Sequence, residues 1–142
     1  MPTPIPTEGT QFYIRDTGGV DIEIESHTGI SGLDGERAEK DRTTLKDSAE
    51  VIALGIKRYG TVTLSVLHAD DDLGLAEVEA AYEDGASRLI TWVWPTGTYR
   101  QFTAYIKNFP FTDGGVDSDY KGDISIRVSG SPTKGSSFVP AV

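Results

Sequence analysis

Residues 88–108 read RLITWVWPTGTYRQFTAYIKN, and this stretch decides the fold class. Residues 88–94 are rich in Ile, Thr, Trp and Val, which favour β-strands. Pro95, Thr96 and Gly97 then lead directly into a second strand-forming run at residues 99–108. Two such runs around a short Pro/Gly turn predict an antiparallel β-hairpin.

Further strand patterns lie on both sides of this hairpin. Residues 10–15, 59–67 and 122–129 are each rich in β-branched, aromatic or alternating apolar side chains. Residues 20–26 alternate strictly, with aliphatic side chains on one face and carboxylates on the other: Val20, Ile22 and Ile24 against Asp21, Glu23 and Glu25. This alternation predicts a half-buried strand.

One helix interrupts the strands. Residues 70–72 are three aspartates, whose short acidic side chains can cap free backbone N–H groups and favour the positive end of a helix dipole. In the helix that follows, Leu75, Val78 and Tyr82 are predicted to share one face, with Ala81 beside them and the acidic side chains opposite. Gly85 is placed to end the helix.

These elements predict a mainly β (α+β) chain. The expected architecture is an antiparallel β-sandwich or partly closed barrel with one flanking α-helix, in a single domain spanning residues 1–142. Residues 31–57 lack a strand pattern and are expected to form a long loop. Residues 1–9 and 131–142 are rich in Pro, or in Gly, Ser and Pro, and are expected to form extended terminal arms.

The predicted loop and arms carry more apolar side chains than solvated segments need. Those in the loop are Leu45, Val51, Ile52, Leu54 and Ile56. They either fold back on the domain's own core or bury themselves against another chain. Those in the arms are Ile5, Phe138 and Val139. A Pro-stiffened arm loses less entropy on docking, so these residues are candidate subunit contacts.

The composition is that of a foldable, acidic chain. Its 142 residues carry a formal net charge of −9 and include no cysteine, which excludes disulfides, thiolate metal sites and a cysteine nucleophile. A negative chain is unsuited to gripping nucleic acid through phosphates. No apolar run approaches the ~20 residues of a membrane span, and the first residues lack a signal-peptide pattern. Seven acidic residues and no basic ones lie within residues 70–84.

No catalytic, metal or cofactor site is predicted. His68 precedes the aspartates of residues 70–72, but neighbouring aspartates in a first helical turn point in different directions and favour a helix cap. Asp113, Asp117 and Asp119 lack the regular spacing and closing Glu of a calcium loop. No phosphate-binding, dinucleotide-binding or nucleophile-elbow motif occurs. We therefore expect a protein that is not an enzyme.

One binding alternative stays open at this point. Trp92, Trp94 and Tyr99 flank the predicted hairpin turn. They could form an aromatic platform for a carbohydrate or a peptide, which would make the chain a small β-sandwich binding module. They could equally cover a core or a subunit contact.

The order of elements resembles that of the major tail tube protein of long-tailed (siphovirus-type) bacteriophages, a family related in fold to type VI secretion tube proteins. The resemblance spans residues 10–132. The stretches that carry it are residues 41–47 (DRTTLKD), 51–56 (VIALGI), 60–64 (GTVTL), 82–85 (YEDG), 94–98 (WPTGT) and 126–132 (IRVSGSP).

The resemblance implies a structural virion protein that forms hexameric rings stacked into a hollow tail tube. Its partners would be further copies of itself, the tape-measure protein, the tail terminator and distal tail proteins, with DNA passing through the lumen without specific binding. Such a subunit is assembled in the bacterial host cytoplasm and resides in the virion tail. In the family, the long loop and the terminal arms connect rings, and a sheath distinguishes contractile relatives.

A conduit for DNA needs walls that do not hold phosphates. A duplex carries one charge per roughly 1.7 Å of axis, and each phosphate that a protein neutralises strengthens its grip. Neutral or acidic walls are therefore expected. The polar face of residues 20–26 supplies the lumen-lining candidates Asp21, Glu23 and Glu25.

Overall fold

Strands dominate the protein. Within residues 3–5, 8–33, 35–46, 48–112, 115–116 and 118–140, which the computed structural model describes, there are nine strands and one α-helix. In chain order they are β1 (Gln11–Arg15), β2 (Asp21–Glu23), β3 (His27–Ser31), β4 (Glu36–Asp41), β5 (Ile52–Arg58), β6 (Thr61–Leu67), α1 (Leu73–Asp84), β7 (Arg88–Val93), β8 (Tyr99–Ile106) and β9 (Lys121–Gly135).

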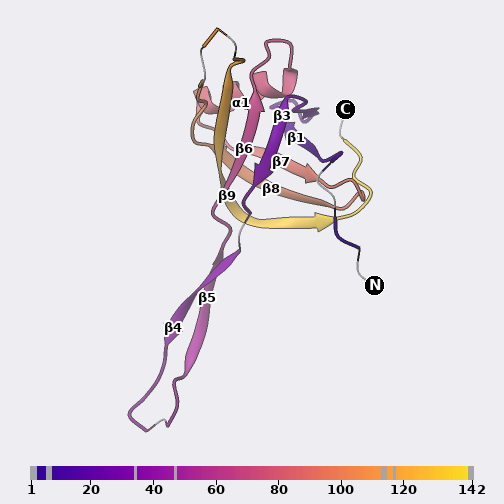
Figure 1. The fold of residues 1–142 in the computed structure, drawn as a ribbon. Coiled ribbons are helices and arrows are strands. Elements are labelled where there is room, and N and C mark those ends of the chain that lie inside the picture. Colours follow the sequence, from indigo (N-terminus) through magenta and orange to yellow (C-terminus); the bar gives the residue numbers. More distant parts are fainter. Residues whose placement is uncertain are drawn as a thin grey trace.

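Seven strands form one antiparallel sheet in the order β2-β1-β7-β8-β9-β6-β3. Strand β9 links its two halves, because its first part pairs with β6 and its later part with β8. Figure 1 shows β9 bending from the β6–β3 half into the half that holds β7 and β8. The order ends at β2 and β3, so the described sheet is not a closed barrel. The predicted antiparallel, mainly β fold with a single helix is confirmed.

The core lies where the two halves of the sheet and α1 face one another. Alternate side chains of the central strands point into it and are buried, such as Val62, Leu64 and Val66 on β6. Phe12 and Phe102 are the largest fully buried side chains. The apolar alternation therefore marked the correct buried face of β6. The strand predicted at residues 20–26 was wrong in part: β2 spans only Asp21–Glu23, and Asp21 of its predicted polar face is buried because it pairs with Arg15.

The helix begins and ends as the sequence predicts. Asp72 is the N-cap, and Gly85 closes the helix with a left-handed φ of 71°. The buried positions are Gly74, Leu75, Val78 and Ala81. Tyr82 lies on the same side of α1 as these residues but is 45% exposed, because it belongs to the last turn of the helix. No helix among the described residues is long and apolar enough to cross a membrane.

The prediction of a long loop at residues 31–57 was wrong. This segment contains the end of β3 and a two-stranded antiparallel ribbon of β4 and β5. All six residues of β4 are exposed. Because neither face of that strand is buried, its sequence carries no apolar alternation to reveal it.

The C-terminal arm also begins later than expected. Residues 131–135 continue β9 and pair with the start of β8, where Gly135 lies opposite Tyr99. Of the two predicted arms, residues 3–5 and 8–9 and residues 136–140 are described outside strands. Residues 1, 2, 6, 7, 141 and 142 of these arms lie outside the described part of the chain.

Candidate assembly surfaces

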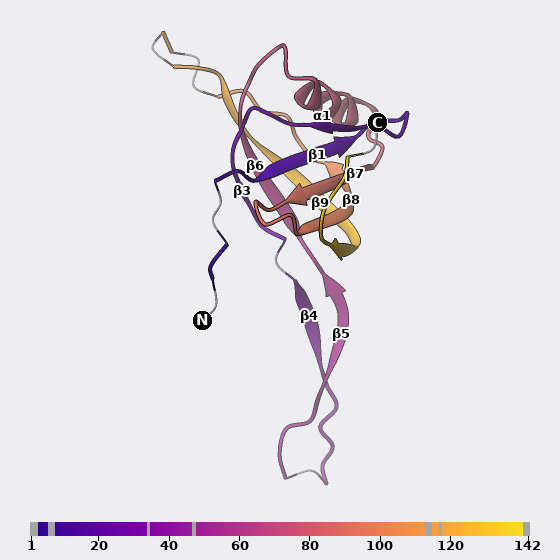
Figure 2. The same ribbon diagram turned by 90° about the vertical axis from the view of Figure 1, so that its right-hand side faces the viewer.

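The β4–β5 hairpin projects away from the body of the protein, which is formed by the seven-stranded sheet and α1 (Figures 1 and 2). Its register pairs Asp41 with Ile52 and Glu39 with Leu54. Ile52 and Leu54 are two residues apart and therefore share one face of the ribbon. The register shifts between Arg37 and Glu39, which marks a β-bulge.

The apolar side chains of the hairpin do not reach the core. Val51 and Ile52 are 44% and 46% exposed, Leu54 and Ile56 are 59% and 78% exposed, and Leu45 is fully exposed. The first alternative for these residues, burial in the domain's own core, is therefore excluded. Their burial against another chain stays a prediction, and an exposed row of aliphatic side chains is the kind of surface that marks an interface.

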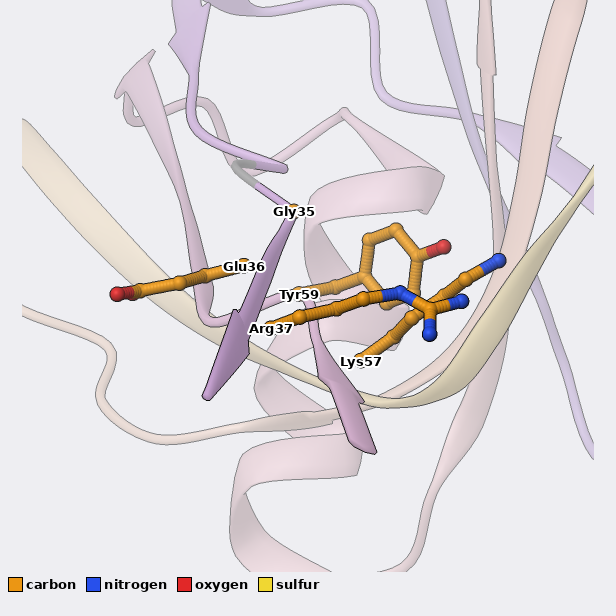
Figure 3. Close-up of a pocket in the computed structure, with 5 residues that line it drawn as sticks. All are labelled: Gly35, Glu36, Arg37, Lys57 and Tyr59. Atoms are coloured by element: carbon orange, nitrogen blue, oxygen red, sulfur yellow. The ribbon is translucent and has the colours of Figure 1, made fainter. Parts of the chain in front are cut away.

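The base of the hairpin carries two neighbouring cations. Arg37 and Lys57 are cross-strand partners, and with Gly35, Glu36 and Tyr59 they line a hollow of about 240 Å³. Figure 3 shows both cationic side chains reaching past the Tyr59 ring, while Glu36 points the other way. Like charges placed directly opposite each other repel. Among the described residues neither cation forms an ion pair.

The candidate contacts in the terminal arms differ in their surroundings. Ile5 is 48% exposed and Val139 is 82% exposed, so both are available to a partner. Phe138 instead packs against the chain's own aromatic rings, with centroids 5.1 Å from Tyr13 and 5.2 Å from Tyr99. This contact straps the C-terminal arm onto the sheet.

The three lumen-lining candidates also occupy different environments. Asp21 is buried and accepts two hydrogen bonds from the Arg15 guanidinium, at 2.9 and 3.1 Å. Glu23 is half-buried beside Tyr13, and Glu25 is exposed in the turn after β2. Burial raises the pKa of Tyr13, and the negative charges of Glu23 and Asp21 raise it further. Asp21 therefore carries a compensated charge, whereas Glu25 faces solvent.

An aromatic cluster was missed by sequence reasoning. It consists of His68, Phe109, Phe111 and Tyr120, from the β6–α1 and β8–β9 connections. His68 stacks on Phe111 with a centroid distance of 3.9 Å, and Phe111 meets Tyr120 edge-on at 6.1 Å. The local signal in the sequence was the pair Phe109 and Phe111, which are separated by one proline and follow a strand.

The tryptophans do not form a flat platform. The rings of Trp92 and Trp94 are nearly perpendicular, at 87°, and the Arg100 guanidinium covers Trp94 at 4.6 Å. Trp92 packs against the core, and Tyr99 packs against Phe138. These rings therefore serve intramolecular packing, and this geometry does not favour the carbohydrate- or peptide-binding alternative.

Of the three aspartates near His68, Asp72 caps the helix, and Asp70 and Asp71 are exposed. Asp72 accepts hydrogen bonds from the backbone N–H groups of Gly74 and Leu75 at 3.0 and 3.3 Å. No group of three or more metal-ligating side chains occurs in the part of the chain that the structure describes. Asp113 and Asp117 of the calcium-like turn lie outside that part.

The chain combines an open-edged antiparallel sheet, one flanking helix and a projecting hairpin, and solved structures share its fold. Among solved structures, the SPP1 tail tube protein matches with a TM-score of 0.74 at 17% identity, covering 94% of this chain and 80% of that one. The tail of the gene transfer agent (GTA) particle matches with a TM-score of 0.77 at 12% identity, covering 94% and 100%.

A weaker likeness of fold is found to a further protein. The Hcp1 protein of E. coli EAEC 042 matches with a TM-score of 0.50 at 10% identity, covering 91% of this chain and 99% of that one. The sequence itself matches no protein-family model and no curated protein. The chain therefore has the tail tube fold, as the resemblance of its sequence predicts.

Proposed function

We propose that this protein is a non-enzymatic structural subunit that assembles into stacked hexameric rings, forming a tail tube through which DNA passes. The observation that carries the proposal is the projecting hairpin. It presents a row of exposed aliphatic side chains on a body whose fold is that of tail tube proteins. Side chains of this kind lower the free energy of the chain only when a partner covers them.

The open sheet supports ring formation. Its two edge strands, β2 and β3, leave backbone hydrogen-bonding groups unpaired, which is a liability in a free monomer. A closed ring of identical subunits removes such edges by pairing one end of the sheet with the other end of its neighbour. The GTA tail, whose subunit this chain resembles in fold, has C6 symmetry, which supports six subunits in each ring.

The proposed partners follow from a tail tube role. Besides copies of itself, the subunit would contact a tape-measure protein, a tail terminator and distal tail proteins. It would reside in the virion tail after assembly in the host cytoplasm. Ile5 and Val139, exposed in the arms, and the aliphatic residues of the hairpin are the proposed contacts between subunits.

The proposed lumen wall is the acidic end of the β2 face. Glu25 and the half-buried Glu23 would present negative charge to a passing duplex and prevent it from adhering. Asp21 would contribute through its compensated pair with Arg15, which keeps the local wall close to neutral.

Self-assembly of purified protein tests the proposal. Concentrated protein, alone or with a tape-measure partner, should show rings or tubes by negative-stain microscopy and a matching fast species in sedimentation velocity. A strict monomer under every condition would contradict it. A saturable tryptophan fluorescence response to glycans, without assembly, would favour the binding-module alternative instead.

A further inference from the structure

The aromatic cluster forms an exposed surface at one end of the body. Phe111 is 59% exposed and Tyr120 is 58% exposed, although both rings are already stacked against neighbours. The connections that carry them lie at the end of the body opposite the hairpin (Figures 1 and 2). Exposed aromatic side chains that are held in place are typical of interface hot spots.

Backbone contacts hold this surface in a fixed shape. A ring nitrogen of His68 hydrogen-bonds the Pro110 carbonyl oxygen at 2.8 Å, and Thr112 bridges to Lys121. Gly122 lies so close to the Pro110 carbonyl oxygen that a side chain there would collide with it. The cluster is therefore a preorganised surface, which lowers the entropic cost of binding.

Acidic residues border the cluster. Asp70 lines the same hollows as His68 and Phe111, and Asp71 is exposed next to it. Further along α1, Arg88 pairs with both Glu77 and Asp84, at 2.9 and 2.7 Å, and offsets one of their two charges. Among the described residues, neither Asp70 nor Asp71 forms an ion pair. Net negative charge is thus left at the end of the helix that adjoins the aromatic rings.

The hairpin has the complementary pattern. Its aliphatic row of Ile52, Leu54 and Ile56 suits an aromatic surface, and the repelling pair of Arg37 and Lys57 suits a carboxylate neighbour. One chain carries the two patterns at opposite ends, so it cannot join them within itself. Contacts between unlike ends of identical chains do not close on themselves and propagate along an axis.

We propose that the aromatic cluster is the docking surface for the β4–β5 hairpin of a second copy of this chain in the next ring. The aliphatic row covers Phe111 and Tyr120, while Arg37 and Lys57 approach Asp70 and Asp71. This inference rests on the proposed tube function and names the surface that receives the hairpin.

Two variants separate the two halves of the contact. The receptor variant is Phe111→Ser with Tyr120→Ser, and the hairpin variant is Leu54→Asp with Ile56→Asp. Each should still form rings, but the rings should stack weakly. The protein concentration needed for tubes should therefore rise roughly tenfold or more. Tyr82→Ser is the matched control, because Tyr82 is an exposed aromatic residue outside the cluster. It should stack like the unaltered protein.

Mixing the two variants provides a test that misfolding cannot imitate. Rings of the receptor variant keep intact hairpins, and rings of the hairpin variant keep intact clusters. A mixture of preformed rings should therefore yield pairs of rings that do not grow further, measured by sedimentation velocity and negative-stain microscopy. Neither variant alone should produce pairs.

The outcomes distinguish this docking from the proposed function. Normal tubes from the receptor variant overturn the docking surface and leave the tube proposal standing. A mixture that stays as single rings also overturns the docking. Unaltered protein that never assembles overturns the tube proposal and this docking with it.

Discussion

One carboxylate, that of Asp72, joins α1 to the turn after β2. One of its oxygens caps the helix, while the other accepts hydrogen bonds from the Ser26 N–H and hydroxyl at 2.9 and 2.6 Å. Burial alone would raise the pKa of Asp72, but the hydrogen bonds from the Ser26 hydroxyl and from nearby backbone N–H groups outweigh burial and lower it. The charged form is therefore the one that the fold stabilises.

Replacing Asp72 with Ala should destabilise the protein by about 2–3 kcal/mol, because a helix cap and the bonds to Ser26 are lost together. A carboxylate with a lowered pKa stabilises the fold above its unfolded-state value and loses this effect as pH falls through the folded value. The difference between the two proteins should thus shrink below pH 3.8, the ordinary value for aspartate. Urea unfolding at neutral and acidic pH measures it.

The neighbouring aspartate is the control for this prediction. Asp71 is exposed, so Asp71→Ala should change the free energy of unfolding by less than about 0.5 kcal/mol. Equal losses of unfolding free energy in both variants would contradict the assignment of Asp72 as the residue that caps α1 and binds Ser26.

A glycine inside the helix provides a second prediction at this scale. Replacing a helical Gly with Ala ordinarily stabilises by about 1 kcal/mol. At Gly74 the added Cβ would collide with the Glu23 carbonyl oxygen, so Gly74→Ala should destabilise instead. Thermal unfolding compares it with Ala80→Gly at an exposed helical position, which should cost only about 1 kcal/mol. A gain in stability for Gly74→Ala would show that α1 does not press against β2.

At the scale of elements, the hairpin is expected to serve assembly and not folding. Because Leu54 and Ile56 are largely exposed, replacing both with Asp should leave the melting temperature within about 2 °C of the unaltered protein. Leu64→Ala, in the fully buried part of β6, should instead cost about 2–5 kcal/mol. Differential scanning calorimetry checks both. A collapse of stability in the hairpin variant would assign its side chains to the core.

The elements that sequence reasoning found are those with one buried face. Apolar and polar residues alternate in strands such as β6, because Val62, Leu64 and Val66 all point into the core. The start of α1 was predicted from its aspartate cap. Strand β4 is exposed on both faces and its sequence has no apolar alternation. Ile52, Leu54 and Ile56 do alternate in β5, but small residues separate them and the face that they form is exposed, so a long loop was expected there. The last part of β9 was hidden for a different reason, because its Pro and Gly residues are typical of arms.

The assembly surfaces were only partly predictable. The aliphatic residues of residues 45–56 were recognised because five such side chains are unusual in a solvated segment. Phe138 was predicted to contact another subunit, whereas in the structure it packs on Tyr13 and Tyr99 of its own chain. This packing depends on the sheet bringing distant residues together. The aromatic cluster was missed for the same reason. His68 and Phe111 are far apart in sequence and meet only because β6 and β9 are neighbours.

At the scale of the whole molecule, chemical labelling of assembled tubes can show which face of the subunit lines the lumen. The chain has no cysteine, so an introduced one is its only thiol. Glu23→Cys and Glu25→Cys place a thiol on the proposed wall, and Glu79→Cys places one on the exposed side of α1. Asp21 is unsuitable, because its replacement would remove two hydrogen bonds from the half-buried Arg15 guanidinium and destabilise the fold by about 1–3 kcal/mol.

In assembled tubes, the Glu25→Cys thiol should react with a small maleimide but be protected from a maleimide carried on a polymer too wide for the lumen. The Glu79→Cys thiol should react with both reagents, and unassembled protein should react with both at every position. Thiol consumption followed by mass spectrometry provides the measurement. The alternative is a lumen lined by the polar face of β6, on which Thr63 lies beside Ser125 of β9. Thr63→Cys tests this alternative. If the polymer-bound maleimide reaches Glu25→Cys but not Thr63→Cys, the lumen is lined by the β6–β9 face instead. Only side chains that line the lumen react with the small reagent and are protected from the wide one.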